Sequence, residues 1–255
     1  MNDPNETFIL NVQKSNTFIS RFKSDNCYSE LVDMIYGDKE NKICFSFSPR
    51  GGCSISFNLY LDFVHLLEDA NKYNSFWVQY YRMHLFNPYT SYINIDQLIE
   101  EKYTFIKLIM NPYIRAVSIF RLQTSHNLSF REYLKQLVDN KIDYFNYTDQ
   151  CHLQKQYIEG EENIITKYIR INENETYTIK LKDGTDYIID PNKYTAPHHG
   201  VKTSNTEFCG DIPKDTINQK LPSSYKYFYD EEIKSLVDRF YKDDVEKYNF
   251  SFDNF

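Results

Sequence analysis

One short stretch of the chain combines residue types that could hold an anion. Pro49 and Arg50 precede two consecutive glycines, Gly51 and Gly52. Glycine permits turns that residues with a Cβ resist, and a helix that begins after such a turn presents backbone N–H groups and a positive dipole end. Arg50 adds a fixed positive charge at the same place. The stretch therefore predicts a phosphate or sulfate site, and an ordinary tight turn is the alternative.

The residues on either side of this glycine pair predict the elements that position it. Ile43, Phe45 and Phe47 alternate with smaller residues, which is the period-two pattern of a strand. Apolar residues recur at helical spacing from 55 to 67. A Walker loop would carry Lys and then Ser or Thr after its last glycine, which this chain does not. A magnesium-dependent NTPase is therefore not the natural interpretation.

A second strand and helix carry another basic and hydroxyl pair. The run from Tyr103 to Met110 is nearly all apolar, as expected of a strand covered on both faces. Asn111 and the proline after it suit the cap and first position of a helix. Arg115 and Ser118 lie three residues apart and so share one face of that helix. They predict a second anion site, and the alternative is a structural ion pair for Arg115 and simple packing for Ser118.

A lone histidine is predicted to lie near the anion site. The aromatic run from Phe76 to Tyr81 resembles a strand and leads into His84. Ligands of parallel α/β sheets lie beyond the carboxyl ends of strands, so we expect His84 near the site, and a surface or packing residue is the alternative. The adjacent histidines at 198 and 199 point apart and have no third ligand at suitable spacing, so no metal site is predicted.

Length and composition indicate one α/β domain that spans residues 1–255, with the first ~40 residues as an extension packed on it. The net charge of -7 argues against a nucleic-acid partner. Five cysteines without a C-x-x-C pair indicate neither zinc nor a disulfide framework. The acidic N-terminus precedes no hydrophobic run, so we expect no membrane segment and a soluble, cytoplasmic protein.

Three further patterns fill in the predicted fold. A capping box, Ser129 to Glu132, opens a helix. Short strands are expected between Tyr168 and Ile189, joined by a hairpin turn at residues 182–185. The segment from Asp230 to Tyr248 predicts a long helix that docks on the domain through its apolar stripe.

Taken together, these segments resemble the carbohydrate sulfotransferases that use 3′-phosphoadenosine 5′-phosphosulfate. Residues 49–54, P-R-G-G-C-S, are similar to the family's P-[KR]-x-[GA]-x-[TS]-[TS], with Ile55 in place of the last hydroxyl residue. Residues 109–120 are similar to its V-R-[DN]-P-[YF]-x-R-x-x-S-x-[YF]. Shorter similarities follow in the same order at residues 129–134, 152–156 and 228–250. The resemblance covers most of the chain from residue 43 to 250.

The resemblance implies a P-loop-containing, three-layer α/β/α fold with a central parallel sheet. It implies transfer of a sulfuryl group from the nucleotide to a hydroxyl of a carbohydrate or other small acceptor, without a metal. Catalysis would fall to Arg50, His84 and His152. The residues expected to bind the nucleotide are Pro49, Arg50, Gly51, Gly52, Cys53, Ser54, Ile55, Asn111, Arg115, Ser118 and Lys202. Family members often work in the Golgi behind an anchor, which is a second possible compartment.

The chain departs from the family at Met110, where the pattern has an arginine on the 3′-phosphate. A charged hydrogen bond of that kind contributes ~1.5 to 3 kcal/mol, so its loss would weaken nucleotide binding unless Arg115, Ser118 or Lys202 compensates. Two other functions therefore stay open. One is a homologue with little or no activity that only binds nucleotide or glycan, and the other is a P-loop kinase.

Overall fold

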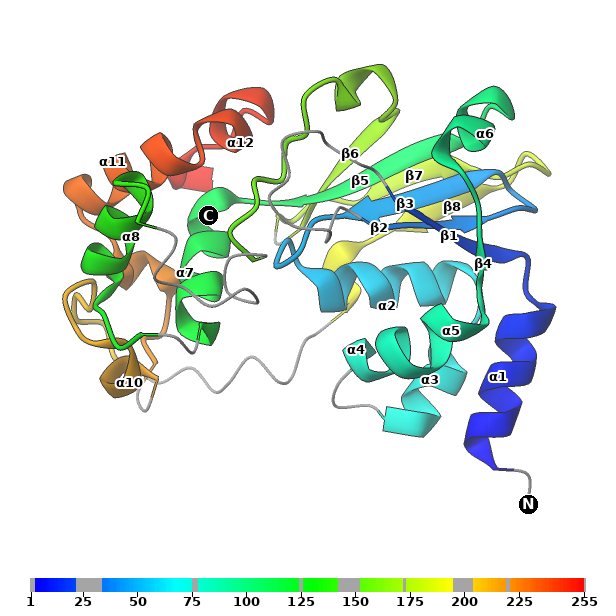
Figure 1. Cartoon of the computed structure of the whole chain (residues 1–255), viewed down its shortest axis with the longest axis horizontal. Helices are drawn as coiled ribbons and strands as arrows, with labels where there is room; N and C mark the ends of the chain where they lie inside the picture. The colour runs from blue at the N-terminus through cyan, green and yellow to red at the C-terminus, as the bar shows by residue number, and fades with distance from the viewer. Residues whose placement is uncertain are drawn as a thin grey trace. The chain divides into compact units, whose positions relative to one another are not determined.

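The computed structural model describes residues 3–21, 34–74, 78–123, 126–141, 152–171, 173–194, 204–218 and 221–254. The chain divides into two compact units (Figure 1). The first comprises Met1–Ile109 and Ile158–His198, and the second Met110–Tyr157 and His199–Phe255. One domain over residues 1–255 stays a prediction.

A six-stranded sheet with the order β4-β1-β2-β3-β5-β6 forms the centre of the first unit. β4, β1, β3 and β5 run in one direction, and β2 runs against them. The α/β class is therefore confirmed. The strands are β1 (Thr17–Arg21), β2 (Met34–Asp38), β3 (Ile43–Phe47), β4 (Ser91–Tyr92), β5 (Thr104–Met110) and β6 (Lys167–Ile171).

The predicted central parallel sheet is confirmed in part, since the sheet is mostly parallel but mixed, with the antiparallel β2 between β1 and β3. Only residues 39–42 connect β2 to β3, and so short a connection can join only antiparallel neighbours. Asp38 closes this turn by accepting the Asn41 N–H at 2.9 Å. The first 40 residues are not an extension either, since they supply β1, β2 and helix α1 (Pro4–Lys14).

Helices cover both faces of this sheet (Figure 1). On one face, Phe45 of β3 packs against Tyr60 and Phe63. On the other face, Phe18, Cys44 and Phe105 form a buried cluster with Leu98 of α6 (Ile95–Glu100). The elements on the Phe45 side are α2 (Cys53–Phe63), α3 (Leu67–Asn74), α4 (Val78–Tyr81), the π-helix η1 (Arg82–Phe86) and α5 (Asn87–Tyr89).

The predicted strand at residues 76–81 is helical where it is described, since α4 covers Val78–Tyr81. Aromatic residues favour strands, but packing overrides this weak preference. Tyr81 and Phe86 of the continuous α4–η1 segment are fully buried, and Tyr81 contacts the Phe8 ring of α1 at 5.7 Å.

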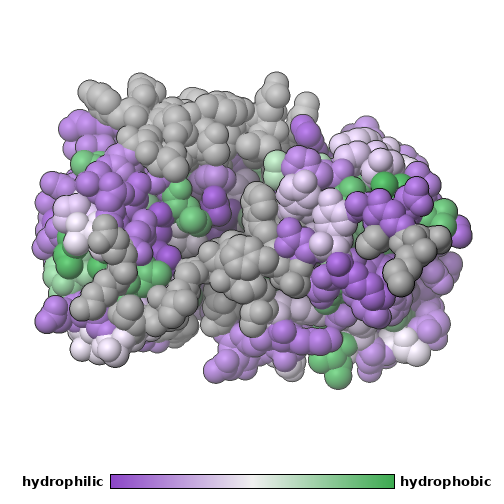
Figure 2. Space-filling model, turned by 90° about the horizontal axis from the view of Figure 1, so that it is seen from below, coloured by the Kyte–Doolittle hydropathy of each residue, from purple (hydrophilic) through white to green (hydrophobic). Residues whose placement is uncertain are grey.

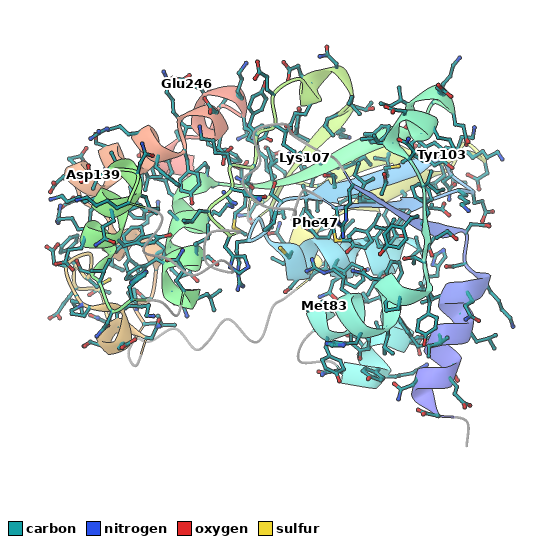
Figure 3. The ribbon with its side chains drawn as sticks, in the orientation of Figure 1. Phe47, Met83, Tyr103, Lys107, Asp139 and Glu246 are labelled. Atoms are coloured by element: carbon teal, nitrogen blue, oxygen red, sulfur yellow. The ribbon has the colours of Figure 1, made fainter. Side chains whose placement is uncertain are left out.

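The remaining elements of the first unit follow β5. Lys107 of β5, labelled in Figure 3, forms a buried ion pair of 2.6 Å with Glu161 of the short helix η3 (Glu161–Asn163). The predicted hairpin is confirmed, because β7 (Tyr177–Lys180) and β8 (Asp186–Ile189) pair antiparallel around Gly184, whose φ is 86°. Helix η4 (Pro191–Lys193) follows it.

The second unit is helical. Ser129 and Glu132 form the predicted capping box of α8. The predicted helix from Asp230 to Tyr248 is two helices that meet at Tyr241, and Asp230 caps the first of them. The helices are α7 (Pro112–Leu122), α8 (Phe130–Val138), α10 (Lys214–Ile217), η6 (Tyr225–Phe228), α11 (Glu231–Phe240), α12 (Lys242–Lys247) and η7 (Phe252–Asn254).

On the face shown in Figure 2, the surface outside the grey atoms is mainly polar, and apolar side chains form small, separate patches there. Within the described ranges, no helix has both the length and the apolar character needed to cross a membrane.

Candidate anion-binding site

The residues between β3 and α2 form a tight turn, called the glycine loop below (residues 48–52). The Gly51 N–H donates to the Ser48 carbonyl at 2.9 Å, which closes a four-residue turn. Pro49 and Arg50 occupy its central positions, and Arg50 has a φ of 58°. Proline followed by a left-handed residue is typical of a type II turn. The left-handed position is thus taken by Arg50 and not by Gly51.

Gly52 ends the turn and begins α2. Its φ is 82°, and as the N-cap residue it supplies no side-chain hydrogen bond to the helix. The first helical bond runs from the Ser56 N–H to the Gly52 carbonyl at 2.9 Å. The N–H groups that precede it, from Cys53 to Ile55, therefore have no intrahelical acceptor. Such a helix start, without a capping side chain, is suited to an anion.

Two serine hydroxyls flank the glycine loop. Ser48 and Ser56 are fully buried, and within the described part of the chain their Oγ atoms have no hydrogen-bond partner. Buried hydroxyls are normally paired, so a ligand oxygen or an ordered water is expected at each. Ser54, which the sequence assigned to the site, is also buried at 7% exposure. These hydroxyls make the loop a better fit to an oxyanion than its glycines alone.

Cys53 ties the loop to the helix in a way that the sequence did not predict. The Arg50 N–H donates to Cys53 Sγ at 3.1 Å, and Sγ lies 3.5 Å from the Ser48 carbonyl. The thiol therefore fixes the backbone of Arg50 in its left-handed conformation. The sequence signal for this contact is the spacing of three residues, because one turn brings residue 53 back over residue 50.

The second predicted site begins with Asn111, which caps α7 as expected. Its Oδ1 accepts the Tyr113 N–H at 3.0 Å, and its Nδ2 donates to the Ser251 carbonyl at 3.1 Å. Met110 before it is buried at 6% exposure. Ser118 lies further along α7 and is partly buried.

Arg115 matches the structural alternative and not the phosphate-binding one. Its side chain is fully buried, donates to the Gln154 carbonyl and lies 3.7 Å from the Asp244 carboxylate. The guanidinium also lies 5.4 Å from the centre of the Tyr241 ring. Its charge is therefore already compensated inside the second unit, which does not fit the role assigned to it at a 3′-phosphate.

The two candidate histidines lie in different surroundings. His84 is exposed in η1, and its ring contacts that of Tyr80 at 4.6 Å. The expectation that it follows a strand is wrong, because that segment is helical. His152 is partly buried, and its carbonyl accepts from Arg115 at 3.4 Å.

Residues 49–55 therefore lie together in the first unit. Residues 111–118 lie in the second unit, in α7 and its N-cap. Lys202 and the paired histidines at 198 and 199 lie outside the described residues. In the described ranges, no three His, Cys, Asp or Glu side chains gather as metal ligands would. A reaction without metal stays a prediction.

Comparison of the chain with models of known protein families, with curated proteins and with solved structures finds no match. The resemblance to sulfotransferases therefore rests on the motifs of the chain itself. The geometry of the glycine loop is the physical observation that bears on it most directly.

Proposed function

We propose that the protein is a sulfotransferase that uses 3′-phosphoadenosine 5′-phosphosulfate and a carbohydrate or other small hydroxyl acceptor. The observation that carries this proposal is the start of α2. A strand leads through a turn bearing Arg50 into a helix whose N-cap, Gly52, offers its first N–H groups no side chain. The order of the two motifs along the chain supports the same assignment.

When bound, the nucleotide would supply the sulfuryl group and a phosphate leaving group. Backbone N–H groups of residues 52–54 and the Ser54 hydroxyl would hold the 5′-phosphate. The Arg50 guanidinium would neutralise the negative charge that develops on the oxygen between phosphorus and sulfur. Such a transfer depends on positioned charge more than on covalent catalysis, by analogy with phosphoryl transfer.

A base must accept the proton of the acceptor hydroxyl. We assign this role to His152 first and to His84 second, which reverses the order that the sequence favoured. His84 is exposed and lies in a helix, whereas the backbone of His152 is held by Arg115 in a buried network.

A protein that binds the nucleotide without transfer is the second candidate function. Two observations favour it: Met110 is buried and carries no charge, and Arg115 is engaged with Asp244. The 3′-phosphate would then depend on Asn111, Ser118 and Lys202. Recognition of the 3′-phosphate is therefore the weaker part of the proposal.

Thermal unfolding with three nucleotides tests these functions. A ligand at about 100 times its dissociation constant adds ~2.7 kcal/mol to the stability of the folded state. We expect stabilisation by 3′-phosphoadenosine 5′-phosphate, and much less by ATP with magnesium. The reverse order would indicate a kinase and contradict the proposal. An assay with labelled donor and a panel of glycan acceptors then distinguishes sulfuryl transfer from binding alone.

A further inference from the structure

The side chain of Tyr36 marks the end of the sheet from which the glycine loop leaves. Its ring stacks on Phe47, the last residue of β3, at 5.4 Å and 7° (Figure 3 labels Phe47). The hydroxyl lies 3.4 Å from Sδ of Met34, which is the β2 residue paired with Phe47. The Tyr36 hydroxyl is therefore at the loop end of β2 and β3.

The π-helix η1 is packed at this same end. The Tyr36 hydroxyl lies 3.3 Å from Oδ1 of Asn87, the residue that follows η1. Phe86 contacts both Tyr36, at 5.8 Å, and Phe57 of α2, at 5.3 Å. These contacts fix η1 against the first turns of α2. Short π-helical segments occur frequently at functional sites.

Arg82, the first residue of η1, is a partly buried cation with no ion-pair partner among the described residues. Its Nε is buried and finds no hydrogen-bond acceptor among the described residues. No carboxylate of the described chain lies within ion-pair distance of it, whereas Arg115, Arg131 and Arg170 each have such a partner. Buried donors are normally paired, so a ligand oxygen or an ordered water is expected at this Nε.

Arg82 and Cys53, the first residue of α2, both influence the pKa of Tyr36. Burial raises this pKa well above its usual value, the positive charge of Arg82 opposes the rise, and Cys53 adds to it. These effects agree with the ring contacts that pack η1 beside the start of α2.

We propose that Arg82 is a second cationic ligand of the anion held by the glycine loop. The ligand class is a group with two adjacent anionic centres, such as a pyrophosphate or a phosphosulfate. Arg50 would meet one centre and Arg82 the other, while Tyr36 and Asn87 position η1. The inference deepens the proposed function, since it concerns the same loop, but it does not require sulfuryl transfer.

The test uses the full chain with inorganic pyrophosphate and 3′-phosphoadenosine 5′-phosphate as probes in titration calorimetry. We expect Arg82→Gln to weaken both by about tenfold to a hundredfold, as the loss of one charged hydrogen bond predicts. Arg82→Lys keeps the charge and should bind at least several-fold more tightly than Arg82→Gln. The control is Arg239→Gln, which removes an exposed arginine of α11 and should leave binding unchanged.

A second measurement needs no variant and therefore holds if Arg82→Gln fails to fold. Phenylglyoxal modifies accessible arginines. We expect pyrophosphate to lower the labelling of Arg82 in the parent protein, measured by quantifying the labelled peptides. Equal affinity in folded Arg82→Gln, or equal labelling with and without pyrophosphate, would overturn the inference. Pyrophosphate binding that depends on Arg82, without binding of the nucleotide, would support the inference and contradict the proposed function.

Discussion

The side-chain amide of Gln156 pairs with both polar groups of the Met110 backbone. Its Oε1 accepts the Met110 N–H at 2.8 Å, and its Nε2 donates to the Met110 carbonyl at 2.7 Å. Gln156 is fully buried, so water cannot replace either bond. A side chain thus continues the hydrogen bonding of β5 where the strand ends and α7 begins.

Replacing Gln156 by Leu should therefore destabilise the fold strongly. Both backbone groups of Met110 would be left buried and unpaired, each at a cost of about 1 to 3 kcal/mol. We expect the free energy of unfolding in urea to fall by roughly 2 to 5 kcal/mol. The exposed Gln97→Leu is the matched control and should change it by less than about 0.5 kcal/mol. A small effect at Gln156 would show that the amide does not hold the strand end.

Replacing Arg115 by Met should act on stability. The change leaves the Asp244 carboxylate buried without its cation, for which the expected loss is about 3 to 5 kcal/mol. Ser118→Ala on the same helix is the comparison for nucleotide binding. If folded Arg115→Met loses far more affinity for the nucleotide than Ser118→Ala, the phosphate-binding role of Arg115 would be restored.

Arg50 tests the loop because its backbone and its charge can be changed separately. Arg50→Ala and Arg50→Gly both remove the guanidinium, so we expect turnover to fall by about 10²- to 10³-fold in each. Gly tolerates a φ of 58° better than Ala, so Arg50→Gly should be more stable than Arg50→Ala by up to about 1 kcal/mol. Lys102→Gly, at a φ of 60° outside the loop, controls for the backbone effect. Near-normal turnover in Arg50→Ala would contradict the role of this arginine.

The two histidines can be ranked by single substitutions assayed with labelled donor. We expect His152→Gln to lower turnover by about 10²- to 10⁴-fold, as for loss of a general base. His84→Gln should stay within about threefold of the parent because its ring lies on the exposed side of η1. The opposite ranking would return the role to His84.

The pH dependence of stability should depend on Arg131. Its guanidinium holds the pKa of Asp230 below the ordinary value, chiefly through a direct hydrogen bond. A carboxylate whose pKa is lowered on folding stabilises the protein above its unfolded pKa, and this contribution disappears as the pH falls through the folded pKa. As the pH falls from about 5 to about 2, the free energy of unfolding should therefore decrease less for Arg131→Met than for the parent. Urea unfolding measures this difference. Equal losses would exclude the pair as a source of acid sensitivity.

The parts of the fold that could be predicted depend on local chemistry. The alternation in residues 43–47, the capping box at Ser129 and the Asn111 cap each specify their structure within a few residues. By contrast, nothing near Ile35 in the sequence indicates that it lies in a strand between β1 and β3, because long-range pairing decides this. The aromatic run before His84 has the composition of a strand, but tertiary packing makes it helical.

The site was only partly predictable for a related reason. A glycine loop between a strand and a helix is visible in the sequence as a contiguous motif. The partner of Arg115 is not, since Asp244 lies far along the chain and only folding brings the two charges together. Arg82 and Tyr36 belong to no sequence motif, so the sequence carries no signal for their position near the loop.

The position of β2 also bears on how the chain folds. β1, β2 and β3 follow one another in sequence as an antiparallel meander, so their contacts close short stretches of chain. Pairing of β3 with β5 must first enclose α2 to α6, and such long loops close slowly. We expect substitutions in the β2–β3 hairpin to slow refolding and substitutions in β5 mainly to accelerate unfolding. The strand that makes the sheet mixed would then be part of the nucleus onto which the parallel strands are added.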